Sequence, residues 1–397
     1  MIDHLKITNI QNRAFMLGSS LALLLIIANQ FTTAGSLVLS ILLCFFWFIS
    51  GQFKNTTLIC KTTPATTIAL LLFLLLFVSI SYSLAPYKAA FSTLAKYREL
   101  LFPLFLIPFF AGSKQYQKAE LFLIISLIAT LLFSYATFFH LLPFKLADHF
   151  LKSRITHSIF IGFLGFIALH KIHHSYNRTH WVIILILSIF NLFVICDGRT
   201  GQLSFLLMCG LFFLQSFNLR IAVIAATVII ISFSILFIFT PLGERFIEGI
   251  NESIGFYQHD PSTDSTSMGI RLHFWQSAIN MIQHNPWLGS GVGGVPFLFS
   301  ELFPEQPQAM SNPHNEYLLL GIQLGLPGLL LFIFLIYSLF KQSLELPQVQ
   351  AWLFQGLLLS LCISCLFNSS ILDNTEGHWY MTLIAVYSSQ LIKLHHA

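Results

Sequence analysis

The stretch Asn312-Pro313-His314-Asn315-Glu316-Tyr317-Leu318-Leu319-Leu320 marks the point where a long polar segment ends and an apolar helix begins. Asn is a frequent N-cap residue and Pro is favoured at the first helical position. We therefore expect His314 in the first turn of this helix, at the boundary between membrane and water. The positive end of a helix disfavours protonation, which favours a neutral imidazole that accepts a proton near pH 7. A His at this position could also be only an interfacial helix cap.

The composition is that of a membrane protein with many spans. Of the 397 residues, 56% are hydrophobic and 9% are charged, whereas about 25% are charged in soluble domains. A polar segment at 1–13 precedes an apolar segment without a small-residue cleavage site, so we expect no removable signal peptide. The six cysteines lie in or beside apolar segments, which indicates neither a disulfide framework nor a zinc site.

Apolar runs long enough to cross a bilayer predict an all-α polytopic membrane protein with about twelve transmembrane helices. The runs lie at 15–29, 34–50, 67–84, 98–112, 119–139, 157–172, 181–196, 202–218, 221–240, 315–340, 350–368 and 378–393. The chain is thus predicted to consist of transmembrane helices 1–9 in residues 1–240, one long loop at 241–313, and transmembrane helices 10–12 in residues 314–397.

The distribution of charge predicts the orientation. With the N-terminus inside, the inner segments hold 11 Lys/Arg and three Asp/Glu, and the outer segments hold nine Lys/Arg and 13 Asp/Glu. The net charges are then +8 inside and −4 outside. Because Lys and Arg are enriched in cytoplasmic loops, we expect both termini in the cytoplasm and the loop 241–313 outside.

Two segments of the outer face have a predicted structure. Apolar residues recur at helical spacing over 267–284, with Ser267 as a plausible N-cap and Asn285-Pro286 as the stop, so an amphipathic helix is expected. The glycine-rich sequence 286–294 follows, and Gly289 and Gly291 could cradle a phosphate or simply form turns. Residues 86–100 read as an interfacial amphipathic helix whose polar side includes Lys88.

Three side chains on the predicted outer face carry the candidate chemistry. Arg199 lies in a tight turn between two membrane helices, where an arginine is costly unless it binds something. A salt bridge to Asp197 or a snorkelling side chain would also explain it. Arg271 lies at a helix start, where backbone N–H groups favour an anion, although it could be an ordinary surface arginine. Two arginines and the neutral His314 would suit group transfer from a diphosphate without a metal.

Several motifs in this order resemble those of the O-antigen ligase family. The resemblance extends over the whole chain in its predicted topology, and Arg154 resembles a further recurrent basic position. The matching elements are His314-Asn315-x9-Gly325-x-x-Gly328, Arg199-x-x-x-Leu203, Gly269-Ile270-Arg271-x-x-x-Trp275-x-x-Ala278 and Asn285-Pro286-Trp287-Leu288-Gly289-x-Gly291.

The resemblance implies a glycosyltransferase in the inner membrane of a Gram-negative bacterium, with its active site facing the periplasm. It would move an undecaprenyl-diphosphate-linked glycan en bloc to lipid A–core, with inversion and without metal or cofactor. Arg199 and Arg271 would hold the diphosphate and His314 would be the base. The further substrate-binding candidates are Arg154, Lys88, Asn315, Gly289 and Gly291.

Other functions stay open at this stage. An O-antigen polymerase or a protein O-oligosaccharyltransferase would use the same donor with a different acceptor. A twelve-span secondary transporter fits the span count, but it predicts two repeated halves, and the long loop makes the halves differ. Asp373 and Glu376 could replace His314 as base or orient it. The only other expected contacts are membrane lipids; no nucleic-acid partner is expected.

Overall fold

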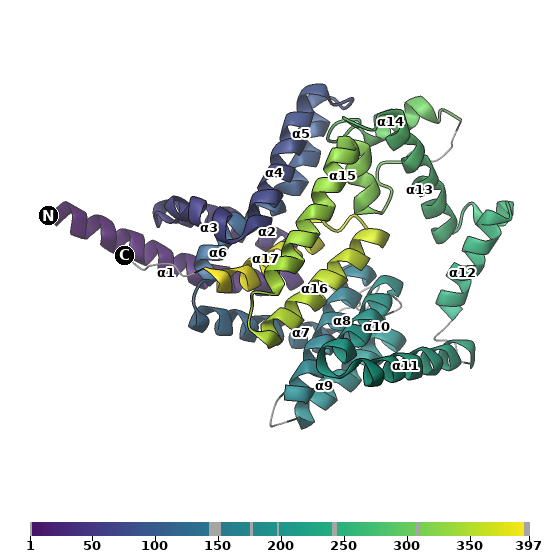
Figure 1. The fold of residues 1–397 in the computed structure, drawn as a ribbon, viewed down its shortest axis with the longest axis horizontal. Helices are drawn as coiled ribbons and strands as arrows, with labels where there is room; N and C mark the ends of the chain where they lie inside the picture. The colour runs from purple at the N-terminus through teal and green to yellow at the C-terminus, as the bar shows by residue number, and fades with distance from the viewer. Residues whose placement is uncertain are drawn as a thin grey trace.

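In a computed structural model, the structure describes residues 2–142, 152–174, 178–196, 198–239, 244–305 and 310–392. Every regular element in these ranges is helical, which confirms the all-α prediction (Figure 1). Asp197, the alternative partner of Arg199, and the expected helix stop at 240–243 lie outside the described residues.

The N-terminal helices form a first group. They are α1 (Ile2–Phe31), α2 (Thr33–Ile49), η1 (Gln52–Asn55), α3 (Thr56–Thr62), α4 (Pro64–Val78), η2 (Ser79–Tyr82), α5 (Tyr87–Lys96), η3 (Tyr97–Leu101), α6 (Phe102–Phe110) and α7 (Ser113–Phe138). A second group follows, with α8 (Arg154–His174), α9 (Thr179–Phe190), the π-helical η4 (Asn191–Ile195), α10 (Arg199–Ser216) and α11 (Leu219–Phe239).

The predicted loop contains helices of its own. These are α12 (Glu244–Tyr257), η6 (Pro261–Thr263), α13 (Ser267–His284) and α14 (Val295–Leu302). The chain closes with α15 (Glu316–Ser343), α16 (Gln348–Phe367), α17 (Asn374–Ser388) and η7 (Ser389–Leu391). The helix predicted at 267–284 is confirmed, although its N-cap is Thr266, whose side chain accepts from Gly269 N.

Six of the described helices are long and apolar enough to cross a membrane, or seven if the bent pair Thr33–Ile49 and Gln52–Thr62 is one span. The full count of twelve stays a prediction. The run at 98–112 divides into η3 and the nine-residue α6. A helix of nine residues is about 14 Å long, too short to cross a hydrocarbon core of about 30 Å.

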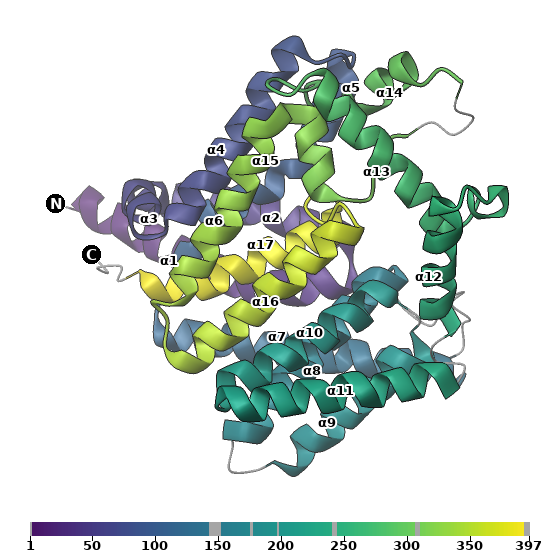
Figure 2. The same ribbon diagram turned by 45° about the vertical axis from the view of Figure 1, so that its right-hand side comes forward.

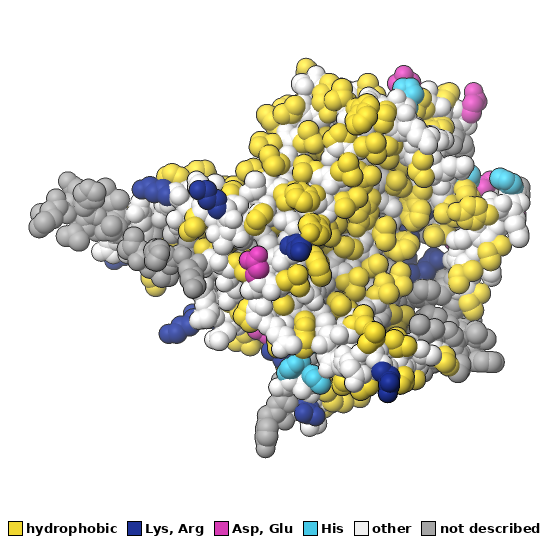
Figure 3. All heavy atoms as spheres, in the orientation of Figure 1, with side chains coloured by type: hydrophobic (Ala, Val, Ile, Leu, Met, Phe, Trp, Pro, Cys, Tyr) yellow, Lys and Arg dark blue, Asp and Glu magenta, His cyan; other side chains and the backbone are white. Residues whose placement is uncertain are grey.

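The long-loop helices lie opposite the start of α1. In Figures 1 and 2, α1 begins at the left, and α12 and α13 lie at the right. The face in Figure 3 is mostly hydrophobic; its acidic groups lie mainly along the top and right, and many of its basic groups lie at the left and bottom.

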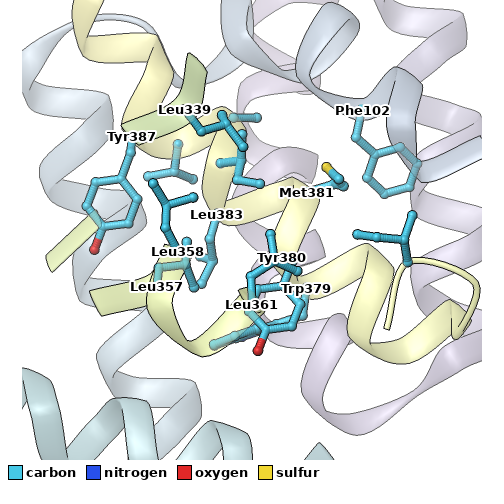
Figure 4. Close-up of a cluster of buried hydrophobic side chains, with 14 of the residues drawn as sticks. Phe102, Leu339, Leu357, Leu358, Leu361, Trp379, Tyr380, Met381, Leu383 and Tyr387 are labelled. Atoms are coloured by element: carbon cyan, nitrogen blue, oxygen red, sulfur yellow. The ribbon is translucent and has the colours of Figure 1, made fainter. Parts of the chain in front are cut away.

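The centre of the fold is α17, which is buried along almost its whole length. Trp379 and Tyr380 are at most 1% exposed, and they belong to one hydrophobic cluster with Phe102 of α6 and with leucines of α15 and α16 (Figure 4). Tyr380 shares a hydrogen bond of 2.9 Å with Ser360 of α16. Close packing and such hydrogen bonds, rather than burial from water, hold helices together inside a bilayer.

Helix α15 is broken at Gly325, where φ is +69°. The glycine-rich segment after α13 fills the break, and Leu326 N donates to Pro286 O at 2.7 Å. A Cβ at Gly325 would lie 2.5 Å from that same carbonyl oxygen. Only glycine combines this backbone conformation with this close approach. The break therefore fixes the loop helices to α15.

Candidate functional site

Arg199 is the first residue of α10 and reaches across to α12. Helices α8 and α10 lie so close together here that a Cβ at Gly201 would be 2.2 Å from the hydroxyl oxygen of Ser158. A Cβ at Gly249 of α12 would lie 2.4 Å from Arg199 Nη1. The guanidinium thus occupies space that any larger residue at position 249 would need.

Arg271, on α13, lies near Arg199. Burial lowers the pKa of Arg271, the positive charge of Arg199 lowers it further, and Glu252 opposes both effects. Among the described residues, neither guanidinium has a carboxylate within 4.0 Å. Two neighbouring arginines without a carboxylate within 4.0 Å in the described part of the chain can bind an anion.

Both arginines line one cavity of about 380 Å³, which we call the arginine cavity. Its walls come from α10, α12, α13 and the end of α16. They are formed by Arg199, Thr200, Leu203, Gly249, Ile250, Ser253, Ile254, Tyr257, Met268, Arg271 and Phe367. Ile250 and Ile254 are 57% and 48% exposed, so two cations adjoin an open apolar surface. Such a surface suits a ligand with an anionic head and an apolar chain.

His314 precedes α15 instead of lying in its first turn, which corrects the sequence prediction. The N-cap is Asn315, whose side chain accepts from Leu318 N at 3.0 Å. Asn312 instead closes a turn, in which its side-chain oxygen accepts from His314 N at 2.8 Å. His314 has φ +52°, a left-handed conformation that is uncommon outside glycine.

The surroundings of His314 favour its neutral form. Partial burial lowers its pKa, the positive charge of Arg271 lowers it further, and a hydrogen bond with the Asn368 side chain raises it. The residue nevertheless keeps exposed surface. Trp275, one turn after Arg271 on α13, donates to Pro313 O at 3.0 Å, so His314 follows a residue that contacts the helix of Arg271.

The turn between α16 and α17 holds the segment of His314. Ser369 Oγ donates to Asn312 Oδ1 at 2.7 Å, and Ile371 N and Leu372 N donate to Glu316 Oε2 at 3.0 and 3.2 Å. These contacts bind the residues on both sides of His314 to one turn. The position of the imidazole is therefore set by residues more than 50 positions later in the chain.

Glu376 is buried and is hydrogen-bonded to Asn368. Asn368 Nδ2 donates to Glu376 Oε2 at 3.1 Å, and Thr156 Oγ1 donates to Glu376 Oε1 at 3.0 Å. Because the Asn368 amide nitrogen points at Glu376, its oxygen is free to accept from an imidazole N–H of His314. Asp373 instead caps α17 by accepting from Thr375 N at 2.8 Å. Sequence analysis missed Asn368, because one asparagine in a loop carries no motif.

The remaining substrate-binding candidates lie outside this cluster. Arg154 is exposed at the start of α8, where its carbonyl lies near the turn before Arg199. Lys88 is exposed on α5, and Asn315 is buried and used as a cap. Neither Arg154 nor Lys88 is among the described residues that line the arginine cavity.

Gly289 and Gly291 use their N–H groups inside the protein. Gly289 N donates to Asn285 O at 3.1 Å, and Gly291 N donates to Gln323 O at 2.9 Å. These donors are therefore not directed at a phosphate, and the glycine-rich segment joins α13 to the break in α15. In the described part of the chain, no three His, Cys, Asp or Glu side chains could hold a metal ion. The metal-independent reaction stays a prediction.

Comparison with protein families gives a match that includes three of the candidate site residues. Residues 182–333 match the family model described as O-antigen ligase. This range contains Arg199, Arg271 and His314, but it ends before Asn368 and Glu376. Comparison with curated proteins gives no match. Residues 182–333 are therefore similar to the O-antigen ligase family.

Proposed function

We propose that the protein is an O-antigen ligase of a Gram-negative inner membrane, with its reaction at the periplasmic face. It would transfer a glycan en bloc from undecaprenyl diphosphate to a sugar hydroxyl of lipid A–core. The family match at residues 182–333 supports an enzyme of the O-antigen ligase or polymerase type. The donor, the acceptor and the roles of individual residues are part of the proposal.

The observation that carries the proposal is the arginine cavity. Arg199 lies close enough to Arg271 to lower the pKa of Arg271. Among the described residues, neither arginine has a close carboxylate. Exposed isoleucines of α12 line the same cavity. A diphosphate would provide the missing negative charge, and a polyprenyl chain would cover the apolar wall. Planar guanidiniums bind phosphate oxygens in pairs and stabilise the leaving diphosphate.

His314 is proposed as the general base. The acceptor oxygen forms a bond to the anomeric carbon of the donor, and the hydroxyl proton passes to a ring nitrogen of His314. The bond from that carbon to the diphosphate oxygen breaks, and its electron pair leaves with undecaprenyl diphosphate. Attack opposite the leaving group inverts the anomeric carbon. The lowered pKa of His314 keeps the imidazole able to accept this proton near neutral pH.

The acceptor is tested by the lipopolysaccharide of a strain that lacks the gene. Bands with core only are expected from the loss of a ligase, whereas core with a single unit would identify a polymerase. Unchanged lipopolysaccharide with an altered glycoprotein would identify a protein O-oligosaccharyltransferase. The family match gives no support to the transporter alternative.

The base is tested by His314→Ala in purified, full-length protein. Loss of a general base typically lowers turnover about 10²–10⁴-fold, and donor affinity should stay near that of the wild type. Turnover near the wild-type rate would show that the base lies elsewhere. Weak donor binding with normal turnover at saturation would make His314 a ligand-positioning residue.

A further inference from the structure

A second cavity, of about 550 Å³, lies between the end of α12 and one face of α13. We call it the aromatic cavity, because Phe256, Tyr257 and Trp275 contribute to its walls. Tyr257 is 75% exposed and also lines the arginine cavity, so the two cavities share a side chain. A ligand seated in one cavity could therefore continue into the other.

Two contacts hold the Trp275 side chain of the aromatic cavity in place. Trp275 Nε1 donates to Pro313 O at 3.0 Å, next to His314. The rings of Trp275 and Phe367 lie 6.2 Å apart, and Phe367 lines the arginine cavity. Trp275 is thus a fixed, flat surface between the aromatic cavity and the proposed reaction centre.

The polar side chains of Asp264, His273 and Gln276 also line the aromatic cavity. His273 Nε2 and Asp264 Oδ1 are 3.0 Å apart, and the His273 ring meets Phe256 edge to face at 4.7 Å between centroids. Gln276 is exposed in the same wall. A carboxylate accepts hydrogen bonds, and a carboxamide both donates and accepts them, so together they can pair with neighbouring hydroxyl groups.

We propose that the aromatic cavity binds a saccharide. Flat aromatic surface suits the apolar face of a sugar ring, and a few placed polar groups fix its orientation. Neither Lys nor Arg is among the described residues of its lining, which disfavours a phosphate ligand. The inference rests on the proposed function in one respect. The sugars would belong either to the glycan joined to the diphosphate in the arginine cavity or to the core that accepts this glycan.

The test measures binding of two saccharides to full-length protein in detergent. Both are released by mild acid from the lipopolysaccharide of the source bacterium: core carrying the O-polysaccharide, and core alone, with dextran as the negative control. Binding of the first only would assign the aromatic cavity to the donor glycan. Equal binding of both would assign it to the acceptor core. Neither saccharide binding better than dextran would overturn the proposal.

The variant pair Gln276→Leu and Gln283→Leu localises the binding. Both glutamines are exposed on α13, but only Gln276 lines the aromatic cavity. Gln276→Leu should weaken saccharide binding about tenfold, through the loss of one or two hydrogen bonds, while Gln283→Leu binds as the wild type does. Equal binding by the two variants at matched unfolding temperature would contradict the proposal.

The two proposals fail in different ways. If wild-type protein binds a saccharide through Gln276 but transfers no glycan, the aromatic cavity is supported and the ligase function is wrong. If wild-type protein transfers glycan but Gln276→Leu changes neither saccharide binding nor turnover, the function stands and the saccharide site is wrong.

Discussion

Removal of the Asn368 amide tests whether the turn after α16 orients the base. The Asn368 side chain is near enough to His314 to raise its pKa by hydrogen bonding, and its nitrogen donates to Glu376 Oε2 at 3.1 Å. Asn368→Ala removes both contacts, so the imidazole is no longer held in one tautomer and orientation. The loss of one net hydrogen bond corresponds to about 0.5–1.5 kcal/mol, and turnover should therefore fall about 2–12-fold. Donor affinity should stay unchanged, because the arginine cavity is not lined by Asn368.

The pH profile gives this prediction a sign. Only neutral His314 accepts a proton, so turnover rises with pH through the pKa of His314 and then levels off. The hydrogen bond with Asn368 raises that pKa. In Asn368→Ala the pKa should be lower, and the acid limb of the profile should move to lower pH while its plateau falls.

The assay is transfer from purified donor to core at saturating acceptor, across the pH range in which the protein stays folded. Asn374→Ala is the matched control, because it removes one side-chain hydrogen bond, to Arg98 Nη2, from the start of α17. It should keep the wild-type plateau and acid limb. If Asn368→Ala also keeps both, Asn368 does not orient the base, and the reasoning from the turn is refuted.

Four further results are expected. Arg199→Lys and Arg271→Lys keep a charge but lose the planar fork, so donor affinity and turnover should both fall about tenfold or more. Donor binding and transfer assays measure the two effects. Wild-type values would show that the arginines do not bind the donor. Gly325→Ala adds a Cβ 2.5 Å from Pro286 O at φ +69°, so stability in detergent should fall by at least about 1–3 kcal/mol, with an unchanged unfolding temperature as the contrary result. In a cysteine-free background, Gln258→Cys should react with an impermeant reagent in intact spheroplasts, whereas reaction only after lysis would reverse the orientation. Transfer should persist in excess EDTA; activity that returns only with Mg²⁺ or Mn²⁺ would contradict metal independence.

Local patterns predicted the parts of the fold that depend on near neighbours. Helix α13 has the predicted bounds, because its apolar spacing and the following Asn285-Pro286 act within a few residues. The cap of α15 was misassigned between two nearby asparagines: both make hydrogen bonds to the backbone, and only the fold decides that Asn315 caps the helix while Asn312 makes a turn.

Features that depend on distant partners could not be predicted. The glycine-rich segment resembles an anion loop until Ile322 and Gln323, about 30 residues later, are seen to accept from its N–H groups. Hydropathy scores α6 like a membrane span, but the helix is only nine residues long, and eight of the nine are buried inside the protein. Arg199 was selected because an arginine between membrane helices is conspicuous, and Arg271 because it lies at a helix start. The fold places both in the lining of one cavity, and their roles stay a prediction.

The central place of α17 has a consequence for biosynthesis. The helix leaves the ribosome about 350 residues after Asn29 of α1, yet Asn29 donates to Thr382 Oγ1 at 3.0 Å and to the carbonyl of His378 at 3.3 Å. Until α17 is inserted, Asn29 lacks these partners, and the turn that holds His314 does not exist. The final packing around Asn29 and His314 therefore forms only after α17 has been synthesised and inserted. A chain cut short before residue 374 would leave the Asn29 amide without these acceptors inside the membrane, which costs free energy.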